Sequence, residues 1–150
     1  MYMVKGSEVL RMTDPRPGEL WLIRSADGQR RAIVCVLSLG RSVASVAFTD
    51  SEADLAYDEE LVFEACSAAP LVVRLSPTLV GPVPRGAFLE RVGAVPVSPD
   101  DLDSVSLGEW PPSLPGRRGL PLAGRSDPRW REAERRVDDI AAFLDRVGGD

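Results

Sequence analysis

The sequence contains no histidine, and it has only two cysteines among its 150 residues. Without histidine there is no Ser-His triad, no histidine acid–base catalysis and no histidine metal site. Cys35 and Cys66 lie far apart in apolar runs, which favours two reduced core residues over a disulfide. No apolar run is long enough to span a bilayer and the N-terminus lacks a signal-peptide core, so we expect a cytoplasmic protein without membrane contact.

Positive charge is also scarce, because 18 Lys and Arg face 23 Asp and Glu, for a net charge of −5. A general nucleic-acid binder is usually basic, so any polyanion site here must be a local patch. The sequence has no phosphate-binding loop, no glycine-rich dinucleotide motif and no metal-ligand cluster. We therefore expect neither a cofactor nor a metal.

The strongest structural signal is a β-hairpin near the start of the chain. The apolar runs 19–24 and 32–37 flank Asp27-Gly28, a pair that favours a tight hairpin turn. The second run is almost wholly apolar, so we predict that it is buried on both faces. Arg30 and Arg31 stand at its entrance.

Further apolar runs predict a curved sheet. Strands are expected at 43–49, 61–66, 71–75 and 88–95, with an exposed acidic loop at 50–60, an irregular edge at 76–86 and a short helix from Ser98. Prolines at 77, 82 and 84 argue against a central strand in the edge segment, and Gly93 suggests a bend or bulge. Short strands with helical additions indicate a mainly β fold, a small and strongly curved barrel.

A second helix is predicted at the end of the chain, where Asp127-Pro128 provides a cap and a first-turn proline. An apolar stripe follows it: Trp130, Ala133, Val137, Ile140, Leu144 and Val147. The stripe favours docking on the barrel or on a partner protein. The expected organisation is an N-terminal tail (1–13), a barrel domain (14–107), a Pro/Gly/Arg-rich linker (108–126) and the amphipathic helix (127–148).

The remaining candidate site combines arginine with a hydroxyl. Arg31 begins one strand and Thr49 ends the next, so a turn at 40–42 places both at the same end of neighbouring strands. This combination suits an RNA phosphodiester, because a guanidinium stabilises charge on the phosphoryl oxygens while the RNA's own 2′-hydroxyl attacks. The alternative is that Arg31 pairs with an acid such as Asp50, and that Thr49 is only a good strand residue.

The order of these segments resembles the PemK/MazF growth-inhibitor toxins. The matching segments are Pro-Gly-Glu-Leu-Trp-Leu (17–22), Gln-Arg-Arg-Ala-Ile-Val-Cys-Val-Leu-Ser (29–38), Val-Ala-Phe-Thr (46–49), Leu-Ala-Tyr-Asp (55–58) and Leu-Glu-Arg-Val-Gly-Ala-Val (89–95) with Leu102 and Val105. The resemblance covers residues 17–107. It implies an SH3-like barrel, a homodimer, and metal-independent cleavage of single-stranded RNA within a toxin–antitoxin or related system.

By position, the resemblance assigns Arg31 as the phosphate-stabilising arginine and Thr49 as the catalytic hydroxyl. Arg30, Arg41 and Arg74 are candidates for binding the RNA backbone. An antitoxin or another protein is the expected partner.

Two alternatives stay open. Ala32 and Ala47 stand where the family usually has proline, which favours a non-catalytic PemK-like protein that binds a protein partner through the barrel or the terminal helix. The second alternative is an acidic regulator that mimics nucleic acid with its surface at 50–64.

Overall fold

The sheet runs through most of the chain. The structure is a computed structural model that describes residues 14–25, 27–52, 55–56, 60–68, 70–96, 98, 101, 116–119 and 121–148. Within them, seven strands form one antiparallel sheet in the order β6-β1-β2-β3-β5-β4-β7. The elements are β1 (Glu19–Arg24), β2 (Arg31–Leu39), β3 (Val43–Asp50), β4 (Leu61–Glu64), β5 (Val72–Pro84), the 3₁₀ turn η2 (Arg85–Ala87), β6 (Phe88–Ala94), β7 (Arg117–Arg118) and helix α3 (Pro128–Gly148).

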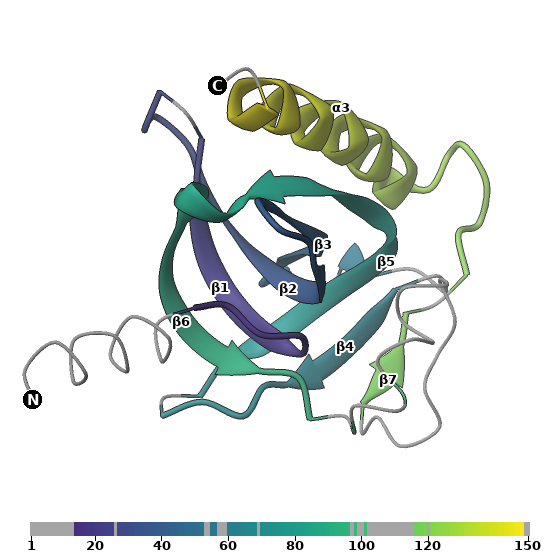
Figure 1. Cartoon of the computed structure of the whole chain (residues 1–150). Helices are drawn as coiled ribbons and strands as arrows, with labels where there is room; N and C mark the ends of the chain where they lie inside the picture. The colour runs from purple at the N-terminus through teal and green to yellow at the C-terminus, as the bar shows by residue number, and fades with distance from the viewer. Residues whose placement is uncertain are drawn as a thin grey trace, which may run out of the picture.

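The sheet curls round on itself, and α3 lies across it beside β5 (Figure 1). The mainly β fold with a C-terminal helix is therefore confirmed. The predicted tail (1–13) lies outside the described residues, as does most of the predicted short helix, and the linker is described at 116–119 and 121–126. Part of that linker nevertheless forms β7, which pairs with β4. None of the described helices has the length and apolarity needed to cross a membrane.

The first hairpin forms as predicted, but its turn is longer than two residues. Arg24 and Arg31 are the last paired residues, and the Ser25 N–H donates to the Arg30 carbonyl over 2.9 Å. Gly28 has a φ of +71°, whereas no described non-glycine residue has a positive φ. A two-residue turn of type I′ needs positive φ at both positions. Asp27 instead organises the loop with its carboxylate, which accepts from the Ser25 hydroxyl and the Gln29 N–H.

Two backbone hydrogen bonds join the far ends of the curl. Cys66 and Ala94 exchange N–H···O bonds of 2.9 Å in each direction. The adjacent Gly93 permits this approach, since a Cβ at that position would lie 3.0 Å from the Cys66 carbonyl oxygen. The pairing of β1 with β6 also shifts by one residue beside Gly93. The predicted bulge is present, and it is where the sheet closes.

Strand β2 separates two apolar clusters. Val34 to Leu37 are buried in succession, as expected for a strand covered on both faces. Cys35 and Leu37 join a cluster inside the curl with β4 and β5 residues. Val34 belongs to a second cluster, which α3 completes. Because side chains alternate along a strand, one strand supplies both layers of the core.

Residues 76–84 are not the irregular edge that their prolines suggested, because they continue β5. Strand β4 pairs with β5 only as far as Leu75, and beyond that point β5 pairs with β3 alone. A missing proline N–H on the unpaired edge therefore removes no ladder hydrogen bond. The sheet bends between Leu75 and Val80, where five residue steps along β5 oppose the two steps along β3 from Ala47 to Thr49.

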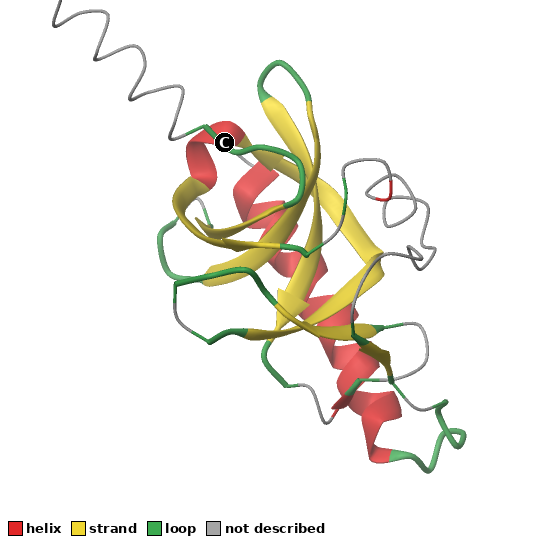
Figure 2. Ribbon diagram, turned by 90° about the horizontal axis from the view of Figure 1, so that it is seen from below, coloured by secondary structure: helices red, strands yellow, loops and turns green. Residues whose placement is uncertain are grey.

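Helix α3 docks through a face that the predicted stripe describes only in part. Ile140 and Leu144 pack on the outer cluster, and Phe143 is the buried residue at its centre. The Phe143 ring meets Phe48 edge-to-face with centroids 5.9 Å apart. Val137 belongs to the stripe but is 49% exposed. Seen from below, the helix runs the length of the sheet (Figure 2).

The two cysteines differ in environment. Cys35 is fully buried, as predicted, and its burial raises the pKa of its thiol to about 12. Cys66 was expected in the core, but it is exposed and unpaired. Its backbone closes the barrel, so its side chain points outward.

The close approach of α3 to β5 depends on Gly81. A Cβ at this position would lie 2.6 Å from Leu144 Cδ1. We predict that Gly81→Val lowers the free energy of unfolding by about 1–3 kcal/mol, because Leu144 must leave its position. Gly86→Val is the matched control, since a Cβ there meets nothing within 4 Å. Urea denaturation of both variants tests this, and equal losses in the two would contradict it.

The burial of the thiols predicts their reactivity. In the native protein at mildly alkaline pH, we expect a disulfide reagent such as DTNB to modify Cys66 alone, because only an exposed thiolate reacts. Both thiols should react in urea. A Cys66→Ser variant with no fast-reacting thiol confirms the assignment, and a native protein that loses both thiols at one rate would refute it.

Candidate functional site

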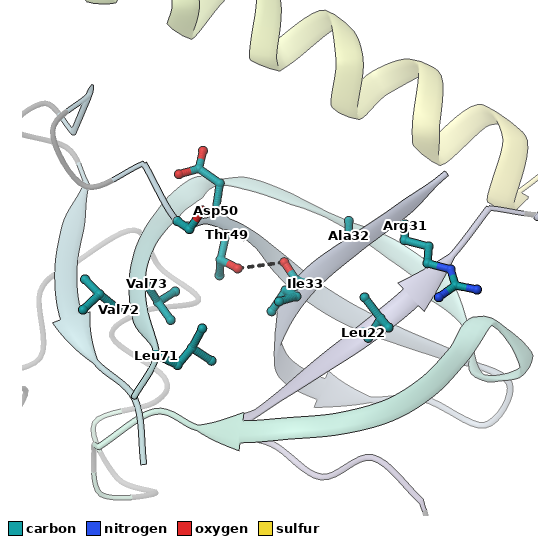
Figure 3. Close-up of a pocket in the computed structure, with 10 residues that line it drawn as sticks. Leu22, Arg31, Ala32, Ile33, Thr49, Asp50, Leu71, Val72 and Val73 are labelled. Carbon is teal, nitrogen blue, oxygen red and sulfur yellow. Dashed lines mark hydrogen bonds between the residues drawn. The ribbon is translucent and has the colours of Figure 1, made fainter. Parts of the chain in front are cut away.

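The structure places Arg31 and Thr49 on the wall of the same pocket (Figure 3). The pocket has a volume of about 340 Å³, and most of its surface is apolar. It lies at the end of the β2–β3 pair and reaches across to the start of β5. The lining residues are Leu22, Arg31, Ala32, Ile33, Thr49, Asp50, Ser51, Leu71, Val72 and Val73.

Thr49 is held by β2. Its side chain is 8% exposed, and its hydroxyl donates a 2.8 Å hydrogen bond to the Ile33 carbonyl oxygen. A hydroxyl has one proton to donate and two lone pairs. In this conformation Thr49 can only accept a further hydrogen bond, for example from a sugar hydroxyl.

Arg31 is exposed at the first position of β2. The β2–β3 register pairs Val34 with Phe48. If this register continues, Ile33 lies opposite Thr49, and Arg31 lies two residues further along β2. Figure 3 accordingly shows Arg31 at one end of the pocket, with its guanidinium turned away from the Thr49 hydroxyl. Within the described residues Arg31 forms no salt bridge. Asp50, which the sequence offered as its partner, pairs with other arginines.

The other predicted backbone-binding arginines are not gathered at this pocket. Arg30 is exposed beside Arg31 and lines a neighbouring cleft. Arg41 is exposed at the other end of β2, in the turn before β3. Arg74 is fully buried. Arg31 and Thr49 thus share one pocket and Arg30 lies beside it, whereas Arg41 and Arg74 lie elsewhere.

Arg74 lies at the centre of an ion-pair network between the barrel and α3. Its guanidinium binds Asp50 of β3 through two hydrogen bonds, 2.9 Å from Nε to Oδ1 and 2.5 Å from Nη2 to Oδ2. Nη2 also lies 3.1 Å from Oε1 of Glu132 on α3. A third carboxylate, that of Glu60, lies 3.4 Å from Nη1.

Arg136 completes the network from the helix. Its Nε lies 3.0 Å from Asp50 Oδ2, and its Nη1 lies 2.7 Å from Glu60 Oε2. Nη1 also donates to the Ser76 hydroxyl over 2.6 Å, and that hydroxyl donates to Glu60. Glu60 is 1% exposed and Ser76 is fully buried. Two guanidinium groups therefore hold three carboxylates at a site largely closed to water.

The network explains the electrostatics of Arg74. Burial by itself lowers the pKa of a guanidinium, but hydrogen bonds to Asp50 and Glu132 and the negative charges of Glu60 and Asp50 raise the pKa of Arg74 above its ordinary value. Arg74 is permanently charged and fully paired. The sequence predicted Arg74 as an RNA-binding residue, but its guanidinium is buried against carboxylates and is not exposed to a phosphate in this structure.

Sequence reasoning missed the network because its members are far apart in the chain. Glu60 lies in an acidic run that suggested an exposed loop, but Glu60 and Ala56 are buried. Glu132 and Arg136 are spaced four residues apart, which is the one available signal that they share a helix face. The hypothesis of an acidic surface that mimics nucleic acid loses two of its carboxylates, because Asp50 and Glu60 pair with Arg74 and Arg136 inside the molecule. Among the described residues, no group of three or more acids or cysteines is placed to hold a metal ion.

No protein-family model matches this chain, and no curated protein is similar enough in sequence to count as a relative.

The buried pairing of Arg74 predicts a large effect on stability. Arg74→Met leaves the three carboxylates with one cation, and we expect a loss of about 3–5 kcal/mol in the free energy of unfolding. Arg135→Met is the matched control, because Arg135 is an exposed arginine of α3 outside the network and its replacement should change stability by less than about 0.5 kcal/mol. Urea denaturation followed by circular dichroism measures both, and similar losses would show that the network contributes little.

Proposed function

We propose that this protein is a PemK/MazF-like endoribonuclease that cleaves single-stranded RNA without a metal, using Arg31 and Thr49. The observation that carries the proposal is that these two residues, first paired on sequence grounds, line one pocket. The pocket is large enough for a nucleobase, and exposed cations flank it. A local basic rim on an acidic protein is what a polyanion site needs here.

The fold supports an SH3-like barrel of the PemK/MazF type as part of the same proposal. The three leading segments of the resemblance fall on consecutive strands: 17–22 on β1 and the turn before it, 29–38 on β2, and 46–49 at the end of β3. The bulge at Gly93 lies in the segment that resembles the family's closing strand. A homodimer, an antitoxin partner and a cytoplasmic location enter the proposal through the resemblance alone.

The proposed chemistry uses the substrate's own nucleophile. The 2′-oxygen forms a bond to phosphorus, the bond from phosphorus to the 5′-oxygen breaks, and the 2′-hydroxyl proton is passed through water to the leaving oxygen. The products are a 2′,3′-cyclic phosphate and a 5′-hydroxyl. Arg31 swings toward the phosphate and stabilises charge on its oxygens. Thr49 accepts from the 2′-hydroxyl and orients it, which matches a hydroxyl whose own proton is already donated.

The second candidate is a non-catalytic interaction protein. The observation that favours it is the commitment of Thr49 to the Ile33 carbonyl, with Arg31 turned away. In that case the barrel is a scaffold, and the outward face of α3, where Val137 is exposed, contacts a protein partner.

RNA cleavage in EDTA separates the two candidates. We predict discrete fragments of a long single-stranded RNA with the wild type, and a rate about 10²–10³-fold lower with Arg31→Ala, because the developing phosphoryl charge loses its donor. Arg31→Lys should recover only part of the rate, since lysine keeps the charge but loses the paired N–H donors.

Arg135→Ala is the control for removal of one exposed positive charge, and it should cleave like the wild type. Circular dichroism must show that each variant is folded. Intact RNA with wild-type protein at high concentration would reject the nuclease and leave the interaction protein. Equal rates for Arg31→Ala and the wild type would reject this site.

A further inference from the structure

A second cavity adjoins the pocket on the far side of Arg31. It lies between the end of the β1–β2 hairpin and the C-terminal half of α3, and has a volume of about 500 Å³. Arg31 and Ala32 line both cavities, so a strand leaving the pocket past Arg31 enters the cleft directly. The cleft is lined by Arg30, Arg31, Ala32, Phe48, Asp139, Ile140 and Phe143.

The two walls of the cleft differ in charge. The hairpin wall carries the exposed cations Arg30 and Arg31, and the helix wall carries the exposed carboxylate of Asp139. None of the three forms a salt bridge within the part of the chain that the structure describes. Between the walls lies an apolar floor. A ligand that fits has an anionic group on one side, hydrogen-bond donors on the other and a flat apolar body between them.

We propose that this cleft is a second nucleotide subsite, occupied by the residue next to the one in the pocket on the same RNA strand. This inference rests on the proposed function. The phosphate that joins the two nucleotides lies at Arg31, and Arg30 contacts the next phosphate. The base lies over Ile140 and turns its donor edge to Asp139.

The subsite selects the base by its donors. A carboxylate only accepts hydrogen bonds, so Asp139 binds the 4-amino group of cytosine and repels the 4-oxo group of uracil. Cytosine and uracil have the same size, so the difference between them isolates this contact. Asp139 is therefore a specificity-determining residue, while Arg31 and Thr49 act on the phosphodiester.

The test uses short fluorescent oligonucleotides that carry a 2′-deoxy sugar at the cleavage position and therefore bind without being cut. The oligonucleotides are made in pairs that differ only by cytosine or uracil at one position, and fluorescence anisotropy measures the binding of each. For wild type we expect cytosine to bind about fivefold more tightly at one position, near the lower end for a base contact because Asp139 is exposed. Asp139→Asn should remove that ratio, because an amide both donates and accepts.

Asp138→Asn is the matched control. It makes the same change in charge one residue away, at an exposed position that does not line the cleft, and it should keep the wild-type ratio. If Asp139→Asn tightens binding of every oligonucleotide equally, Asp139 is a general repulsive charge and the subsite is refuted. The subsite is also refuted if both variants keep the wild-type ratio while Arg31→Ala weakens binding; RNA recognition at the pocket then stands. A wild type that binds none of the oligonucleotides rejects both proposals.

Discussion

The buried ion pairs of Arg74 fix how the barrel and its terminal helix fit together. Two arginines and three carboxylates come from β3, β5, the residue before β4, and α3. The apolar contacts around Phe143 supply most of the docking energy, because buried charges gain little net energy after desolvation. The charges instead penalise other alignments: sliding α3 by one turn would take Glu132 away from Arg74 and Arg136 away from Asp50 and Glu60, which leaves one buried cation facing two carboxylates. The buried charges thus hold α3 at one particular position on a barrel that has its own core.

This constraint also decides which charges face solvent. Asp50 follows Thr49 directly and lines the pocket, yet both its oxygens are held by arginines behind the pocket wall. It therefore neither neutralises Arg31 nor repels an anion as strongly as a free carboxylate. Arg24, Arg30 and Arg31 remain exposed around the end of the first hairpin. Structural pairing of acids inside the molecule thus creates the basic rim that the composition alone does not predict.

The sequence predicted the features that depend on neighbours in the chain. Apolar runs beside Asp27-Gly28 located β1 and β2, alternating apolar residues located β3, Asp127 marked the start of α3, and Gly93 marked the closing bulge. The predictions that differ from the structure share one cause, because the structure at those positions depends on segments distant in the chain. The prolines of β5 are tolerated because β4 stops at Leu75, a fact about another strand. Arg74 looked like a surface cation because its partners lie up to 58 residues away, the separation between Arg74 and Glu132.

The net charge of −5 is a weak guide to what this protein binds. Charges in physiological salt are screened within about 8 Å, so a phosphate at the pocket senses the hairpin arginines and Asp139 far more than the acids elsewhere. Helix α3 matters in this respect twice. Glu132 on its inner face pairs with Arg74, which is buried. The next turns of the helix place Asp139 opposite Arg30 across the cleft. The same helix that completes the core therefore also places a carboxylate beside the hairpin arginines, and under the proposed function this carboxylate links the docking of the helix to the choice of base.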